Sequence, residues 1–329
     1  MTLATESFGP SRKLRWVGWV LRALGMPALL AAAIALTRLA HPDFGPFEIQ
    51  TLALGALPLA LAAAAQAIVV ISGGIDLSIG SLIAVANVLS ASLMQHATFK
   101  ESLAWSALVL ACGAAAGFSN GLIVALSRVP DVVATLTTGF IWGGVALLIL
   151  ESPGGGAPAA YANIAAGSDF GPWLPNALVV MVLAVAGIWL PITQTRIGLL
   201  IYAAGSDPVA AFRSGVNVRG ARTIAYVSSG IVCAVGGMAL TMTTGIGAPL
   251  AGSYYTLSSV AAVVIGGVSL AGGRGGLIGP VIAAVLLTLA PMDLVFLGID
   301  PNYGQVIQGT LIVLVVMVAG FFAYLQERK

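Results

Sequence analysis

Asp76 is the residue whose type and surroundings point most directly to chemistry. It is an acid within the apolar stretch Val70-Ile71-Ser72-Gly73-Gly74-Ile75-Asp76-Leu77-Ser78-Ile79-Gly80-Ser81. An ionised carboxylate at the middle of a bilayer costs about 2.5–3.5 kcal/mol on insertion scales. Because its neighbours are compatible with lipid, we expect Asp76 at a break between helices or in a polar interior.

Two roles for Asp76 follow from these neighbours. In the structural role, Gly73 and Gly74 end one helix, and Asp76 or Ser78 caps the next by accepting hydrogen bonds from free backbone N–H groups. In the functional role, the carboxylate accepts hydrogen bonds from a hydroxylated solute or lines a gate. A single acid beside a glycine pair favours capping or gate architecture over direct contact with a solute.

Uncharged polar residues at membrane depth form a second set of candidates. Donors and acceptors without charge, placed beside an aromatic face, suit the recognition of hydroxylated solutes. Each such side chain alone is more often a hydrogen bond between helices, worth about 0.6 kcal/mol. The candidates for a substrate pathway or gate are Asp76, Ser78, Asn87, Asn120, Thr135, Trp142 and Gln305.

The largest polar loop, 193–222, contains a short segment with the character of a docking helix. Asp207 followed by Pro208 is a good helix start, since proline is tolerated at the first helical position. Val209 and Phe212 give an apolar stripe that suits docking to a soluble partner, whereas a solvated linker helix is the alternative. The candidate docking residues are Asp207, Pro208, Val209, Ala210, Ala211, Phe212, Arg213, Ser214 and Gly215, the last of which is expected to end the helix.

Several enzyme chemistries are excluded by missing residues. A phosphate-binding P-loop needs Gly-Lys-Ser/Thr, and none of the lysines Lys13, Lys100 and Lys329 follows a glycine. The chain therefore does not hydrolyse ATP by itself. The two cysteines and two histidines have no metal-ligand spacing, so we expect no catalytic residue, bound metal or cofactor.

Composition places the chain in the membrane. Of its 329 residues, 59% are hydrophobic and only 8% are charged, with a mean hydropathy of +1.01. Soluble domains carry about 25% charged residues, so this chain lacks the charges for a water-exposed surface. The net charge of +2 is too small to suggest a nucleic-acid partner. We predict an all-helical, multi-pass membrane protein with lipid around it.

About ten apolar segments approach the ~20 residues that a helix needs to cross a bilayer. They lie at 17–39, 49–72, 77–95, 103–126, 132–150, 173–192, 223–244, 255–271, 276–291 and 304–325. This layout predicts a cytoplasmic tail at 1–16, one transmembrane domain at 17–325 and a second cytoplasmic tail at 326–329.

Loop charges give an independent test of this layout. With the N-terminus in the cytoplasm, only Arg38 and Lys100 of the fourteen basic residues fall outside, which leaves twelve inside. Basic residues accumulate in cytoplasmic loops, so both termini and the loop 193–222 are predicted to be cytoplasmic.

The region 255–291 is open to two topologies. Its two apolar runs are short and meet at Gly272-Gly273-Arg274-Gly275-Gly276. A re-entrant hairpin would bury Arg274 at membrane depth at high cost, so two short spans are favoured. A weak internal echo joins Val69–Ile75 to the similar run Val263–Val268.

The chain resembles the permease subunit of bacterial ABC importers of the ribose/galactose/xylose type, from about residue 50 to 320. The resemblance is carried by 73–81, by Ser119-Asn120-Gly121, by Val129-Pro130 with Ala134-Thr135-Leu136, by 205–218 and by 261–275. It departs from the family at Trp142-Gly143-Gly144, where Arg-Gly is usual, at Thr256-Leu257, where an acid is usual, and at Asp207, where Asn is usual. These departures leave the substrate open.

The resemblance implies how such a chain works. It implies a dimeric subunit of the bacterial inner membrane, paired with an identical or related permease and fed by a periplasmic sugar-binding protein. A cytoplasmic ATPase would use ATP and magnesium and dock on residues 208–215. The expected activity is import of a monosaccharide or related polyol by alternating access. The alternatives are another hydroxylated or nucleoside-like solute, or a proton-coupled secondary carrier, which the scarcity of ionisable residues within the spans disfavours.

Overall fold

The structure, a computed structural model, describes residues 12–127 and 129–300 together with seven positions between 303 and 317. In chain order its helices are α1 (Arg12–Ala40), α2 (Pro46–Ile71), α3 (Ile79–Met94), α4 (Phe99–Leu126), α5 (Asp131–Ile149), α6 (Ala159–Ala166), α7 (Asn176–Gln194), α8 (Arg196–Ser206), α9 (Pro208–Arg213), α10 (Val218–Thr244), α11 (Ser253–Ile265) and α12 (Ile278–Phe296). Over this part of the chain the predicted all-helical class is confirmed.

The helices fall where the apolar segments predict them. Within the described residues, six are long and apolar enough to cross a membrane: α2, α4, α5, α7, α10 and α12. Three further predicted segments correspond to shorter apolar helices, at Leu24–Ala40 within α1, at α3 and at α11. The predicted segment 304–325 lies mostly outside the described residues.

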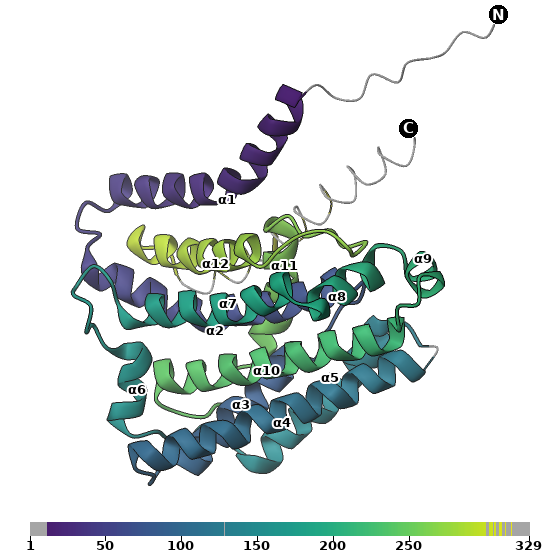
Figure 1. Ribbon diagram of the computed structural model, residues 1–329. Coiled ribbons are helices and arrows are strands. Elements are labelled where there is room, and N and C mark those ends of the chain that lie inside the picture. Colours follow the sequence, from purple (N-terminus) through teal and green to yellow (C-terminus); the bar gives the residue numbers. More distant parts are fainter. Residues whose placement is uncertain are drawn as a thin grey trace, which may run out of the picture.

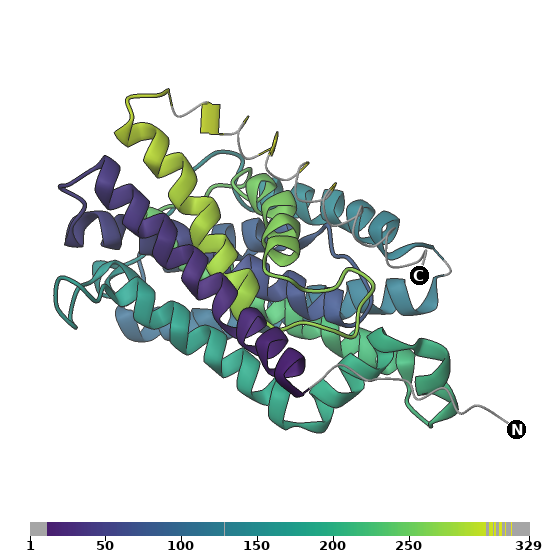
Figure 2. The ribbon, with the colours of Figure 1, turned by 90° about the horizontal axis from the view of Figure 1, so that it is seen from above.

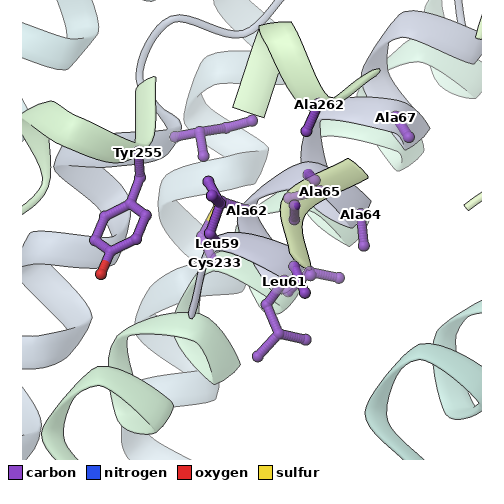
Figure 3. Close-up of a cluster of buried hydrophobic side chains, with 14 of the residues drawn as sticks. Leu59, Leu61, Ala62, Ala64, Ala65, Ala67, Cys233, Tyr255 and Ala262 are labelled. Carbon is purple, nitrogen blue, oxygen red and sulfur yellow. The ribbon is translucent and has the colours of Figure 1, made fainter. Parts of the chain in front are cut away.

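α2 is the centre of the bundle. Every residue from Ala56 to Ile71 is buried, and the helix contacts α7, α10, α11 and α12. Its alanine run, Ala62–Ala65, belongs to the same buried cluster as Cys233 of α10 and Ala262 of α11 (Figure 3). Because lipid offers no hydrophobic drive between helices, close packing of small side chains is what holds such helices together.

The bundle has two distinct ends. α6 and α9 lie at opposite ends (Figure 1). We call these ends the α6 end and the α9 end. At the α6 end, the Thr37 hydroxyl of α1 bonds to the Asp293 carboxylate of α12 at 2.9 Å. These two helices lie side by side along the bundle (Figure 2). The loop 266–277 lies at the α9 end, where the Gly273 N–H donates to the Ile71 carbonyl at 2.9 Å.

The region 245–277 differs from its prediction. α11 ends at Ile265 rather than at 271, and its 13 residues span only about 20 Å at 1.5 Å per residue. Residues 245–252, which precede α11, are irregular and run beside α3, so that Gly252 and Gly80 meet backbone to backbone. Arg274 is exposed in the loop at the α9 end, which agrees with two short segments rather than a hairpin with a buried arginine.

The sequence echo between α2 and α11 is a shared way of ending a helix. In both, the N–H groups two and three residues beyond the last helical residue donate to carbonyl groups one and two residues before it, at 2.9–3.1 Å. Gly73 and Gly267 supply the left-handed residue at φ values of 88° and 78°. This is the Schellman motif, in which glycine is preferred because it has no Cβ.

Candidate functional site

The connection between α2 and α3 turns back into the protein. After the Gly73 turn, Asp76 returns to the level of Gln66, more than one helical turn before the end of α2. With its amide oriented to satisfy both groups, Gln66 donates to the Asp76 carbonyl at 2.8 Å and accepts from the Asp76 N–H at 3.2 Å. Both residues are at most 1% exposed. The predicted break between helices at Asp76 is therefore present and buried.

A chain of hydrogen bonds leads from Asp76 through Ser78 to two helices, α4 and α5. Asp76 Oδ1 accepts from the Ser78 N–H at 2.9 Å and from the Ser78 hydroxyl at 2.5 Å. Asn120 Nδ2, from α4, donates to the same hydroxyl at 2.6 Å. Trp142 Nε1, from α5, donates to Asn120 Oδ1 at 3.3 Å. We call Asp76, Ser78, Asn120 and Trp142 the Asp76 network.

Thr135 attaches the same connection to α5. Its hydroxyl oxygen accepts from the Leu77 N–H at 3.0 Å and lies 2.9 Å from the Asp131 carbonyl, one turn earlier in α5. Thr135 is fully buried. The connection between α2 and α3 is thus hydrogen-bonded to side chains of α2, α4 and α5, which lie far apart in the sequence.

The predicted helix cap is wrong in detail. Ser78 precedes α3, but its side chain makes no capping hydrogen bond. The Asp76 carboxylate bonds to Ser78 itself rather than to the N–H groups of the first helical turn. Its second oxygen, Oδ2, is buried without a hydrogen-bond partner in the described part of the chain. A buried carboxylate oxygen left unbonded is costly.

Asn87 holds a different place, nearer the α6 end. Its Nδ2 donates to the Thr241 hydroxyl at 2.8 Å and to the Ile246 carbonyl at 3.1 Å. Its Oδ1 accepts from the Ala248 N–H at 2.7 Å. Asn87 therefore fastens the irregular segment 245–252 to α3 and is fully buried while it does so.

The structure brings together five of the seven predicted pathway or gate residues and separates one. Asp76, Ser78, Asn120, Thr135 and Trp142 surround the α2–α3 connection, whereas Asn87 binds the segment before α11. Gln305 lies outside the described residues. The partners Thr241 and Ile246 were not predicted, because they follow Asn87 by more than 150 residues and no local pattern marks them.

The short helix α9 has the predicted form. It is made of Pro208–Arg213 and is capped by Asp207, whose Oδ1 accepts from the Val209 and Ala210 N–H groups at 2.9 Å each. Val209 is 60% exposed and Phe212 is 73% exposed. Gly215, with φ at 84°, follows the helix as expected. A groove of about 760 Å³ lies between Phe212 and the start of α10.

Residues 49–316 match the protein family described as the permease component of the branched-chain amino acid transport system. This match covers most of the chain. The chain belongs to this permease family. It is therefore a transport subunit rather than an enzyme, and a multi-pass protein of the bacterial inner membrane.

Its curated relatives are import permeases. The fructose import permease of Rhizobium meliloti is 35% identical over 266 residues, which cover 78% of this chain and 72% of the relative. The ribose import permease of Escherichia coli K12 is 30% identical and covers 97% of this chain and 98% of the relative. The galactofuranose transporter permease of the same strain is 32% identical, with coverage of 94% and 92%. No solved structure matches the chain.

Proposed function

We propose that this chain is the transmembrane permease subunit of an ABC importer that carries a monosaccharide or related polyol. The observation that carries the proposal is the full-length similarity to a ribose permease, at 97% of this chain and 98% of the relative. Relatives named for fructose and galactofuranose point to the same solute class. The family description names branched-chain amino acids, but these long matches are sugar permeases.

The chemistry at membrane depth supports a neutral solute. An amino acid carries both an ammonium and a carboxylate, and binding it at membrane depth calls for opposite charges or helix ends aimed at each. The Asp76 network instead combines hydroxyl, amide and indole groups, and its one acid is bonded to Ser78. Since no arginine or lysine belongs to this network, it offers no counter-charge to a carboxylate, which favours a neutral hydroxylated solute.

The candidate residues divide into two roles. Asp76, Ser78, Asn120, Thr135 and Trp142 form a gate at the α9 end, because together they tie the α2–α3 connection to α4 and α5. Asn87 stabilises the segment 245–252 toward the α6 end. Unwound backbone at membrane depth is tolerated where protein buries it or where it lines a cavity, and we propose that this segment lies beside the solute pathway. Gln305 is retained as a pathway candidate.

We infer that the α9 end faces the cytoplasm. Arg213, Arg219 and Arg274 are exposed there, and basic residues favour the cytoplasmic side. This orientation gives ten spans within 17–325 and puts the tails 1–16 and 326–329 in the cytoplasm.

The partners follow from this orientation. A cytoplasmic ATPase docks on residues 207–215 through Val209 and Phe212, whose apolar side chains are exposed on a rigid, capped helix. A periplasmic sugar-binding protein delivers the solute at the α6 end, and a second permease subunit completes the pathway. The chain binds no cofactor of its own, since the ATPase uses the ATP and magnesium.

Reconstitution tests the proposal. The permease, its co-encoded ATPase and its binding protein are placed in proteoliposomes, and uptake of labelled ribose, fructose, galactose and leucine is measured with and without ATP. We expect uptake of at least one sugar that requires ATP. Uptake of leucine alone, or of sugar along a proton gradient without the ATPase, would contradict the proposal.

A further inference from the structure

Three backbone segments meet at the α9 end with almost no side chain between them. The end of α2 supplies Ile71 and Gly73, the end of α8 supplies Gly205, and the loop after α11 supplies Gly272 and Gly273. The Gly273 N–H donates to the Ile71 carbonyl at 2.9 Å. We call the contact among these five residues the glycine junction.

The junction admits no larger residue at its centre. A Cβ placed on Gly205 would clash with the Ile71 carbonyl oxygen, and one on Gly272 would lie 2.7 Å from the Gly205 carbonyl oxygen. Gly73, Gly272 and Gly273 also have positive φ values of 67–88°. Real Cβ atoms do not approach this closely, so a shift of any one segment must move the other two.

α8 is joined to α9 without slack. Asp207 is the only residue between the two helices, and its carboxylate caps α9 while its N–H bonds back to Ala203 of α8. Tyr202 of α8 donates from its hydroxyl to the Gly275 carbonyl at 2.7 Å. A force applied to α9 therefore reaches Gly205 and the loop 266–277 through short, bonded steps.

The other side of the junction leads to the Asp76 network. The chain runs from Gly73 to Asp76 in three residues, and Gly74 is held between neighbours on both sides. A Cβ on Gly74 would lie 2.7 Å from Asp131 Oδ2 and 2.9 Å from the Tyr226 hydroxyl. The connection between α2 and α3 thus has little room to absorb a displacement at Gly73 before it reaches Asp76.

We propose that the glycine junction transmits movement of α9 to the Asp76 network and so couples the ATPase to the gate. This inference rests on the proposed function and adds the route by which the motor acts. Rigid, bistable contacts amplify small shifts in this way. The force passes from α9 through Asp207 and Gly205 to Gly73, and then along the α2–α3 connection.

α10 offers a second connection between α9 and the Asp76 network. α10 also follows α9 in the chain, and Arg222 Nη2 lies 3.4 Å from the Gly73 carbonyl and its Nη1 lies 3.8 Å from Asp131 Oδ2. If α10 alone carried the movement, the contact of Gly205 with Ile71 would be dispensable for coupling.

Gly205→Ala tests the junction, with Gly187→Ala as its matched control. Both change a helical glycine to alanine, but no atom lies within 4 Å of a Cβ at Gly187. Each variant is reconstituted with the ATPase and the binding protein. We measure co-purification of the ATPase, its basal hydrolysis, the stimulation by sugar-loaded binding protein, and uptake.

For Gly205→Ala we expect the ATPase to co-purify and its basal hydrolysis to persist, while stimulation and uptake fall by about tenfold or more. Gly187→Ala should match the wild type. Unchanged coupling in Gly205→Ala would overturn the proposal, as would loss of ATPase binding, because the residue would then serve docking. If the wild type itself showed no ATP-driven uptake of sugar, the proposed function would fail instead.

A second variant keeps the test decisive if Gly205→Ala does not fold. Insertion of one glycine between Ser206 and Asp207 changes no residue of the junction and lengthens the joint between α8 and α9. We expect this variant to bind the ATPase and to lose stimulation by about tenfold. Wild-type stimulation with the insertion would contradict transmission through α8.

Discussion

The Asn120 amide donates to the Ser78 hydroxyl across 2.6 Å, and this bond joins the C-terminal half of α4 to the residue that precedes α3. Ser78 in turn donates to Asp76, so that a buried acid and two helices share one hydroxyl group. Any movement of α3 relative to α4 must break this bond or move both residues together, which is why we propose a gate here.

Asp76→Asn should fold normally and transport poorly. The amide retains an oxygen that accepts from the Ser78 N–H, so the connection keeps its shape, but the negative charge is lost. We expect ATP-driven uptake to fall by about tenfold, with an unchanged thermal unfolding midpoint. Asp43→Asn makes the same chemical change at an exposed position and should leave uptake unaltered. Wild-type uptake in Asp76→Asn would reduce the acid to a replaceable structural group.

Asn87→Ala should destabilise the protein. The substitution removes the acceptor of the Ala248 N–H and the donor to Thr241, and each buried group left unbonded costs about 1–3 kcal/mol. A lower thermal unfolding midpoint in detergent is the expected result. Ser90→Ala is the control on the same helix, because in the described part of the chain its hydroxyl bonds only to the nearby Ala86 carbonyl. Equal midpoints for the two variants would mean that 245–252 is held by packing alone.

Phe212→Asp should abolish binding of the ATPase. Phe212 is 73% exposed at the α9 end, and a charge there removes the apolar contact that docking requires. Phe170→Asp, at an aromatic residue that is 61% exposed near the α6 end, is the matched control. We expect the ATPase to co-purify with the control and not with Phe212→Asp. Co-purification with both variants would show that α9 is only a linker.

Much of the fold was predictable because the membrane imposes a simple rule on sequence. Nine of the ten apolar segments that the sequence predicts correspond to apolar helices in the described part of the chain. The short helices α6 and α8 were not predicted, since helices of 8–11 residues between the spans carry no comparable signal. In the passage 245–265, the irregular residues before α11 were not predicted, for a related reason. Its irregular part is held by Asn87, and hydrogen bonds between distant residues leave no periodic pattern.

The site shows the same division. Asp76 was identifiable because an acid in an apolar stretch is costly, and α9 because proline and glycine punctuate it. The bonds from Asn120 and Thr135 to the Asp76 connection depend on how α4 and α5 pack. Similarly, the contact of Gly205 with Ile71 arises between segments 134 residues apart, the difference between their positions in the chain. Because the chain has 41 glycines, a glycine does not mark such a contact by itself.

Measuring which side of the membrane α9 faces tests most directly whether a cytoplasmic ATPase drives this permease. Single cysteines at Val209 and Trp173 are made in a background lacking Cys112 and Cys233 and treated with a membrane-impermeant maleimide. Intact spheroplasts should label Trp173→Cys and not Val209→Cys, and inside-out vesicles should reverse the result. Labelling of Val209→Cys from outside intact cells would contradict the mechanism, because no cytoplasmic ATPase could then reach α9.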